Sequence, residues 1–327
     1  MTRMLSGIAV VALLGATPAA AQDVLRAQTA LPTQHTLSQS FIKHFIEPLN
    51  AAGGDVQVNL LGGPEVNPQD RAGQALERGL LDILWIPAAF ISGQFPEGQA
   101  MMLQNVGIED LHENGSVEHF RELFREGMNA HFLAWSETGA GYYLYLTSEP
   151  PRDANGVVDL TGMSIRSTGA YRPIIEALNG TPVSIPAGDV PQALDRGVIN
   201  GFGWPTVGLE SIGLHESVSH RVEPSFYHLA NVVLVNADRW ERMSDEQREL
   251  LSRIAAEYEL ASVTEMHEQG EMDIAAGDRT GITAVTMEGE AAERYLSIAF
   301  DAMWDTVRGN LGDETTDGLR AMIYREN

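Results

Sequence analysis

Apolar strand-like runs alternate with helical patterns from Val24 to Pro87, and this alternation constrains the fold more than any other feature of the sequence. The runs typical of strands span residues 24–29, 56–61 and 80–86, and the helical patterns between them end near residues 50 and 78. Asn67 and Pro68 have the pattern of a helix start, and Gly79 has that of a helix stop. Strands that alternate with helices in this way predict an α/β lobe with a largely parallel sheet.

Two segments repeat one local pattern, ALERGLLD at residues 75–82 and ALDRGVIN at residues 193–200, and each is followed by a tryptophan, Trp85 and Trp204. The repeat indicates either two similar lobes or an ordinary connection in which a Gly-capped helix runs into a strand. The chain is long enough for two lobes rather than one core. Ligands of open α/β sheets bind beyond the carboxyl ends of strands, so both tryptophans are candidates for the space between lobes, with core packing as the alternative.

The stretch from Gly162 to Pro205 places Arg166 at the end of a short predicted strand, just before a helix predicted at residues 170–179. We expect Gly169 to cap the start of this helix and Gly180 to end it in the left-handed conformation. Free N–H groups at the helix start would then help the Arg166 guanidinium to bind a carboxylate. An ordinary ion pair is the alternative, and the preference for arginine says little because Lys43 is the only lysine.

The first 21 residues have the pattern of a secretory signal peptide, with Arg3 before a short apolar run and three alanines at the end. The apolar run is too short for a membrane anchor. We therefore expect the mature chain to begin at Gln22 and to lie in a bacterial periplasm, with release outside the cell as the alternative.

The composition argues against two classes of binding partner and against stabilisation by disulfide bonds. Loss of Arg3 lowers the formal net charge of −24 by one further unit, which makes nucleic acid and anionic lipid poor partners. The chain has no cysteine, so its stability comes from burial rather than from disulfides.

A long helix is predicted after the strand at residues 232–236. Ser244 and Gln247 form a capping-box pattern, and the apolar positions that follow continue to Gly270 or beyond. Such a helix is roughly 40 Å long, enough to lie across both lobes. A strand near residues 283–287, a helix near 290–308 and a short helix within 312–327 complete the predicted body.

Motifs of catalysis and metal binding are scarce. His215, Glu216 and His220 resemble a zinc-helix motif, but the histidines are five residues apart rather than four and would not share a helix face. The sequence contains no GxSxG elbow, SxxK, P-loop or complete GxGxxG motif. We therefore expect no enzyme activity, no cofactor and no metal site.

The chain resembles the periplasmic solute-binding proteins of TRAP (tripartite ATP-independent periplasmic) transporters, of the dicarboxylate-binding-protein type. The segments that carry the resemblance most specifically are GMSIRSTG and PVSIPAGDVPQALDRGVINGF, with weaker matches in VNLLGGPEVNPQDRAGQALERGLLDI and VVLVNADRWERMS. The resemblance implies a two-lobed α/β fold with a ligand cleft between the lobes and a long helix spanning both. We expect one lobe to comprise residues 22–143 and 232–271, and the other residues 144–231 and 272–327.

The resemblance also implies a function. Arg166 would bind the carboxylate of a small organic acid, the lobes would close around it, and the TRAP membrane subunits would take it up on an ion gradient. The ligand-binding residues expected from the sequence and the resemblance are Arg166, Trp204, Trp85, Gly169, Pro87 and Tyr227. Members that bind sialic acid add charged partners from the first lobe, whereas the stretch from Trp85 to Phe90 is apolar here. Members that bind 2-oxo acids through a metal carry a carboxylate beside the tryptophan of the second-lobe turn, where this chain has Gly203 before Trp204.

We therefore expect a carboxylate with a modest apolar or aromatic body and no bound cation. The alternatives are a periplasmic enzyme that acts on a small carboxylate through His35 or His228, and a receptor for an ABC transporter or a sensor kinase.

Overall fold

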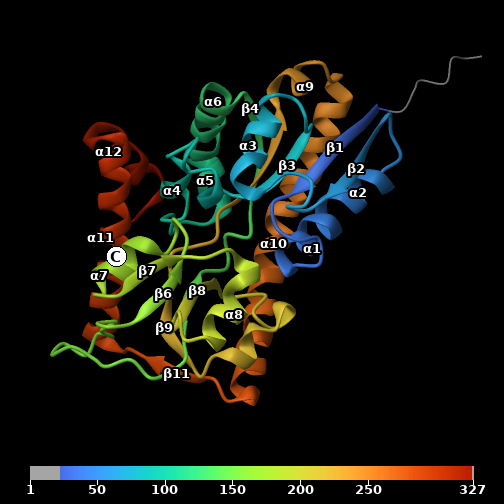
Figure 1. Cartoon of the computed structure of the whole chain (residues 1–327). Helices are drawn as coiled ribbons and strands as arrows, with labels where there is room; N and C mark the ends of the chain where they lie inside the picture. Colours follow the sequence, from blue (N-terminus) through green and yellow to red (C-terminus); the bar gives the residue numbers. More distant parts are fainter. Residues whose placement is uncertain (1–22, 326–327) are drawn as a thin grey trace, which may run out of the picture.

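The computed structural model describes residues 23–325, and the predicted signal peptide lies outside the described residues. The chain forms two α/β lobes, each built around one sheet, and one long helix runs along both of them (Figure 1). None of the helices in this described range is long and apolar enough to cross a membrane. The predicted α/β class with two lobes is confirmed.

The first sheet has five strands in the order β2-β1-β3-β10-β4. The bounds are β1 (Asp23–Thr29), β2 (Val56–Gly62), β3 (Ile83–Pro87), β4 (Ala130–Ser136) and β10 (Asn231–Asn236). Strand β1 pairs in parallel with β2 and β3, whereas β10 runs antiparallel between β3 and β4. The predicted parallel pairing is confirmed for β1, β2 and β3, whereas the sheet as a whole is mixed because β10 runs antiparallel to both of its neighbours. Every residue of β3 and β10 is buried, as expected for central strands that are covered on both faces.

Short helices surround the first sheet. They are α1 (Thr36–Phe41), α2 (Glu47–Ala51), α3 (Gln69–Glu77), α4 (Gly98–Met101), α5 (Ile108–Glu113), α6 (Ser116–Met128) and α9 (Ala237–Glu241). A π-helical turn at residues 42–46 joins α1 to α2, and Pro48 falls in the first turn of α2.

The second sheet has six strands in the order β11-β9-β5-β8-β6-β7. The bounds are β5 (Tyr142–Leu146), β6 (Ser164–Ser167), β7 (Thr181–Ser184), β8 (Gly201–Pro205), β9 (His220–Phe226) and β11 (Thr283–Thr286), with helices α7 (Arg172–Ala177) and α8 (Val190–Asp195) beside them. Strand β6 lies parallel to both β7 and β8, and this arrangement places the end of β6 at the junction with the first lobe (Figure 1).

The chain passes between the two sheets at residues 137–141, at residues 227–230 and along α10 (Asp245–Thr280). The capping box of Ser244 and Gln247 is confirmed. The helix passes through Gly270 and ends only at Gly281, whose φ of 94° is left-handed. Its 36 residues correspond to about 54 Å at 1.5 Å per residue, so it spans both lobes as predicted.

The C-terminal helices α11 (Gly289–Leu311) and α12 (Asp313–Ile323) pack beside the junction of the lobes. Asn105 in the first lobe accepts a hydrogen bond from Arg325 N and donates its own N–H to Ile323 O, so α12 is held against that lobe. The predicted division of the chain into residues 22–143 with 232–271 and residues 144–231 with 272–327 stays a prediction.

The helix after Arg166 differs from the prediction. It begins after Tyr171, not after Gly169, and α7 has only six residues. Thr168 accepts the N–H groups of Tyr171 and Arg172 on its carbonyl and that of Ala170 on its hydroxyl, so these donors are already occupied. The expectation that these N–H groups are free to help Arg166 bind an anion is therefore wrong.

The end of this helix differs as well. Asn179, with φ of 66°, takes the left-handed conformation that was expected of Gly180. Gly180 is instead required for close approach, because a Cβ there would lie 3.0 Å from the Ile175 and Leu160 side chains.

Candidate ligand-binding site

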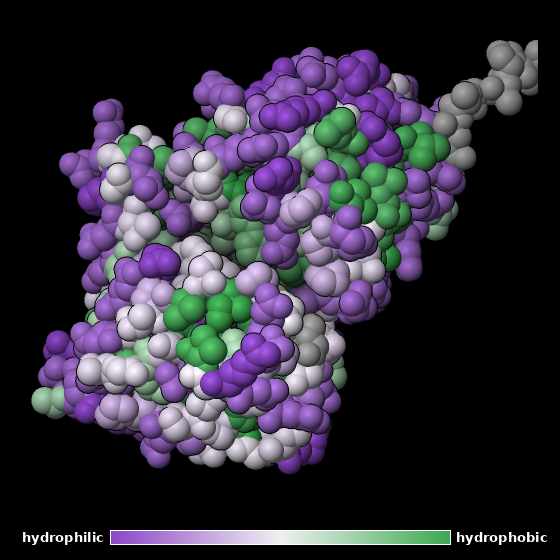
Figure 2. Space-filling view, in the orientation of Figure 1, coloured by the Kyte–Doolittle hydropathy of each residue, from purple (hydrophilic) through white to green (hydrophobic). Residues whose placement is uncertain are grey.

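A cavity of about 60 Å³ lies between the two lobes, below a hollow that is visible on the surface in Figure 2. Since an enclosed water needs about 10–15 Å³ on this scale, the cavity has room for a solute the size of a few waters. Its walls come from both lobes, and the lining residues are Leu31, His35, Leu37, Gln69, Pro87, Ala89, Phe90, Tyr142, Arg166, Thr168, Ala170, Tyr171, Trp204, Pro205, Leu229 and Asn231.

Arg166 is the one lining side chain that carries a full charge at neutral pH, and only 5% of it is exposed. Its Nε donates to Ile185 O at 3.0 Å, and its guanidinium carbon lies 5.7 Å from the centre of the Trp204 ring. Burial lowers the pKa of the guanidinium, which nevertheless titrates far above neutrality. Within residues 23–325 no carboxylate pairs with it, and its two terminal nitrogens have no protein acceptor.

Arg221, in β9 of the same sheet, is a buried arginine that has carboxylate partners, unlike Arg166. It is equally buried, with 3% exposed, and lies 5.6 Å from the Tyr143 ring centre. Its guanidinium pairs with Glu223 Oε1 at 2.8 Å and with Asp278 Oδ1 at 3.5 Å. A buried arginine is normally paired, so the unpaired guanidinium of Arg166 is the feature that calls for an anionic ligand.

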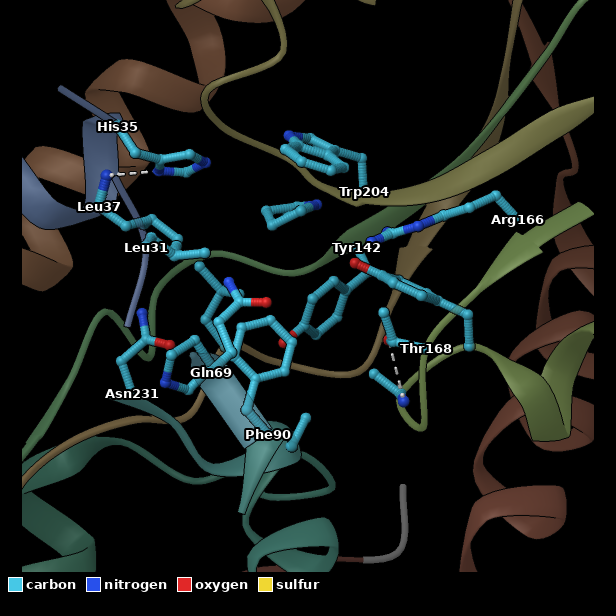
Figure 3. A pocket seen from close by; sticks show the side chains of 16 residues that line it. Leu31, His35, Leu37, Gln69, Phe90, Tyr142, Arg166, Thr168, Trp204 and Asn231 are labelled. Atoms are coloured by element: carbon cyan, nitrogen blue, oxygen red, sulfur yellow. Dashed lines mark hydrogen bonds between the residues drawn. The ribbon is translucent and has the colours of Figure 1, made fainter. Parts of the chain in front are cut away.

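The first-lobe wall is apolar only in part. Pro87, Ala89 and Phe90 line the cavity, as expected for the stretch from Trp85 to Phe90. Two polar side chains that the sequence reasoning missed, Gln69 and Asn231, stand beside them (Figure 3). Asn231 is the first residue of β10, after a connection between the lobes, and Gln69 is the first residue of α3. These two residues are far apart in the sequence, so the order of strands in the sheet brings them together.

The His35 side chain extends from the first lobe toward Trp204 of the second lobe. Its Nδ1 accepts the N–H of Leu37 at 3.2 Å, which places the ring proton on Nε2 (Figure 3). Burial lowers the pKa of His35 to about 4, so the ring is neutral at pH 7. The ring centre lies 6.1 Å from that of Trp204, and a Cβ at Gly208 would lie 3.3 Å from its Cε1. His35 is thus a contact between lobes.

The two tryptophans of the repeated pattern have different surroundings. Trp204 lines the cavity, whereas Trp85 is fully buried, donates its Nε1–H to Tyr258 OH at 3.1 Å and does not reach the cavity. When the two segments are aligned on Gly79 and Gly197, which share a left-handed φ of 69° and 66°, the tryptophans fall one residue apart. Successive side chains of a strand point to opposite faces, so a one-residue offset turns Trp85 into the core.

Of the other predicted site residues, some lie at the cavity and one lies in the core. Pro87 lines the cavity and Gly169 lies between two lining residues, where a Cβ would be 3.8 Å from Ser92 Oγ of the first lobe. Tyr227 does not reach this cavity, because its hydroxyl donates to Ala299 O at 2.6 Å inside the second lobe. Trp85 and Tyr227 are therefore core residues, and Arg166, Trp204 and Pro87 are those that the fold brings together.

The arrangement suits binding rather than reaction. No lining residue is a carboxylate, and His35 has no carboxylate or nucleophile as a hydrogen-bond partner within the described chain. Gly203 packs on Tyr171, where an added Cβ would lie 2.3 Å from the ring. No group of three or more His, Cys, Asp or Glu residues between 23 and 325 is arranged to hold a metal. His228 lies outside this cavity, within the connection at residues 227–230.

Comparisons with known proteins agree with this geometry. A family model described as bacterial extracellular solute-binding protein, family 7 (DctP), matches residues 27–306. The periplasmic ectoine-binding protein TeaA of Halomonas elongata is 22% identical over 300 residues, which are 88% of this chain and 85% of that protein. A monocarboxylate 2-oxoacid-binding periplasmic protein of Nostoc sp. is 27% identical over 163 residues, which are 47% of this chain and 42% of that protein.

The fold is also known from crystal structures. An extracytoplasmic solute receptor of Bordetella pertussis that binds pyroglutamic acid matches with a TM-score of 0.78 and 12% identity, over 92% of this chain and 99% of that one. At this level of identity the match establishes the fold.

Proposed function

The chain belongs to the bacterial extracellular solute-binding proteins of family 7, and from this premise we propose that it is the extracytoplasmic receptor of a TRAP transporter for a small organic carboxylate. The receptor takes the carboxylate from the periplasm, holds it between its lobes and delivers it unchanged to the membrane subunits, which drive uptake with an ion gradient. Two of the three similar proteins bind solutes that are named as carboxylic acids, pyroglutamic acid and 2-oxoacids.

The observation that carries the proposal is the unpaired guanidinium of Arg166. Its Nε is occupied by Ile185 O, so its two terminal nitrogens form a fork toward the cavity. A carboxylate matches this fork with two parallel charge-assisted hydrogen bonds. Since Arg166 is buried, these bonds are stronger than the same contact on the surface.

We infer that binding is coupled to closure of the lobes. The cavity is complete only when Pro87, Ala89 and Phe90 of the first lobe face Arg166 and Trp204 of the second. A ligand held by Arg166 gains these first-lobe contacts only in the closed form, so it shifts the population of lobes toward closure. In this proposal the moving lobes are residues 22–143 with 232–271 and residues 144–231 with 272–327, and the membrane subunits recognise the closed form.

Calorimetry and a thermal-shift screen of mono- and dicarboxylates, with and without a chelator, test the proposal. A ligand at 100 times its Kd adds about 2.7 kcal/mol of stability. We expect one-to-one binding that is lost in Arg166→Met, with the ligand recovered unchanged by mass spectrometry. Turnover of the ligand would favour the periplasmic enzyme instead, and binding that survives in Arg166→Met would refute the assigned anion site.

A further inference from the structure

We propose that the ligand carries, besides its carboxylate, a hydrogen-bond donor such as a hydroxyl or ammonium group on the end that faces the first lobe. There the side chains of Gln69 and Asn231 present amide oxygens. The inference rests on the proposed function, because it takes the carboxylate contact with Arg166 as its starting point.

Asn231 has a buried acceptor without a partner at the wall of the cavity. The residue is fully buried and lines the cavity, and its Oδ1 has no hydrogen-bond partner. Its Nδ2 donates to Glu137 Oε2 at 3.0 Å. A buried amide oxygen without a partner costs free energy, so it is expected where a ligand completes the hydrogen bond.

The orientation of the Asn231 amide follows from the network behind it. Trp85 Nε1 is a donor only, and it donates to Tyr258 OH, so Tyr258 must use its own hydrogen on Glu137 Oε1. Ser136 Oγ lies within hydrogen-bond distance of both Glu137 Oε2 and Asn231 O. Asn231 turns its N–H₂ toward Glu137 Oε2 and its oxygen away.

Gln69 likewise has its amide nitrogen bonded to the protein and its amide oxygen without a protein donor in the described chain, through contacts that do not involve Glu137. Its Nε2 donates to Ala30 O at 2.8 Å, so its amide nitrogen is held by the first lobe. No donor in the described chain reaches its Oε1. Figure 3 shows the carboxamides of Gln69 and Asn231 together on one side of the cavity, opposite the Arg166 guanidinium.

The second-lobe wall has the opposite character. Arg166 offers its terminal N–H groups, and the buried Nε1–H of Trp204 has no hydrogen-bond partner. His35 offers a further donor at Nε2, beside Trp204 rather than beside the two amides (Figure 3). Among the guanidinium and amide groups, the donors thus lie at the Arg166 end of the cavity and the two amide oxygens at the other end, while the hydroxyl groups of Tyr142, Thr168 and Tyr171, which also line it, can donate or accept. A second carboxylate at the acceptor end would meet two amide oxygens, so the expected ligand is a hydroxy- or amino-monocarboxylate rather than a dicarboxylate.

Matched ligands test this pattern in the wild-type protein. The probes for calorimetry are 3-hydroxypropanoate, 4-hydroxybutanoate and 5-hydroxypentanoate, their terminal amino analogues, and butanoate, pentanoate and hexanoate, in which a methyl group replaces the donor. Succinate and glutarate replace it with a carboxylate. We expect the best donor-bearing probe to bind about tenfold or more tightly than its methyl and carboxylate counterparts, because a site built around polar groups rejects analogues that leave them unpaired.

Variants locate the preference. Gln69→Met is expected to remove most of the advantage of the donor-bearing probe, while the methyl probe keeps its affinity. Gln39→Met is the matched control, since exposed Gln39 likewise donates its Nε2 to a backbone carbonyl, Thr33 O at 2.6 Å, but does not line the cavity. Asn231→Leu removes the second oxygen. If Asn231→Leu fails to fold, the comparison of Gln69→Met with Gln39→Met and the probe series on the wild-type protein still test the inference.

The outcomes separate the two claims. Arg166-dependent binding with equal affinity for donor-bearing and methyl probes at all three lengths would overturn this inference and leave the receptor function standing. An equal loss for both probes in Gln69→Met would also overturn it, because a purely structural role acts on every ligand alike. Failure of all probes to bind wild-type protein, or full binding by Arg166→Met, would instead count against the proposed function.

Discussion

Replacement of Arg166 by methionine separates a ligand-binding arginine from a structural one. Methionine keeps an unbranched apolar side chain against Trp204 and removes the guanidinium. The matched control is Arg221→Met, because Arg221 is equally buried in the same sheet and also lies over an aromatic ring, but is paired with Glu223 and Asp278. The two variants are expected to have opposite effects on binding and on stability.

The magnitude for Arg166→Met follows from its two unoccupied terminal nitrogens. A hydrogen bond to a charged group contributes about 1.5–3 kcal/mol, so two such bonds contribute about 3–6 kcal/mol to ligand binding. At 1.4 kcal/mol per factor of ten, Kd rises roughly 100-fold to 10,000-fold. Without ligand the variant loses the bond to Ile185 O and the contact of the guanidinium with the Trp204 ring, but it no longer keeps an unpaired charge out of water. Its unligated stability is therefore expected to stay the same or to rise.

Arg221→Met leaves Glu223 partly buried without its partner, which costs about 1–3 kcal/mol of folding free energy. Unfolding entropy is about 2.1 cal/mol/K per residue, so for about 300 residues this corresponds to a fall of about 2–5 °C in Tm. The ligand affinity is expected to change by no more than about twofold, because Arg221 does not line the cavity.

Differential scanning calorimetry without ligand and titration calorimetry with the best carboxylate of the hydroxy and amino series measure both quantities. Saturating ligand at 100 times its Kd is expected to raise the wild-type Tm by about 4 °C and to leave that of Arg166→Met unchanged. An Arg166→Met protein that binds within threefold of wild type would refute the reasoning. So would a pair of variants that lose stability and affinity to the same extent.

Three further predictions concern stability. His35 is buried and His131 is half-buried, and their pKa values are lowered to about 4 and about 3, so the unfolded chain gains protons first as pH falls from 6.5. Stability is then lost, by up to about 3 kcal/mol for His35 alone, and a Tm-against-pH curve that is flatter in His35→Gln checks this. Gly203→Ala places a Cβ 2.3 Å from the Tyr171 ring, and urea unfolding should show a loss of about 1–3 kcal/mol or more. In Gly270→Ala the added Cβ inside α10 lies 3.9 Å from Val207 Cγ1, an ordinary van der Waals contact, so the same assay should show a gain of about 0.5–1 kcal/mol, and a loss would contradict the proposed packing.

Much of the fold was predictable because local rules determine it. The parallel strands of the first lobe, the left-handed Gly79 and the capping box at Ser244 each depend on residues a few positions apart. The same rules placed Arg166 at a strand end. They failed at the end of α7, where Gly180 is needed for close packing on Leu160, and Asn179 takes the left-handed turn instead.

The content of the site depended on contacts between distant parts of the chain. By itself the sequence determined the α/β class, the long helix and an arginine at the edge of a sheet, since strand and helix periodicity and capping are properties of short segments. Only the tertiary structure decided that Arg166 has no carboxylate beside it, that Trp85 turns into the core, and that Gln69 and Asn231 face the cavity together. The physical reason is that strand order and side-chain parity bring these residues together from positions up to 162 apart, a pairing that no local pattern encodes.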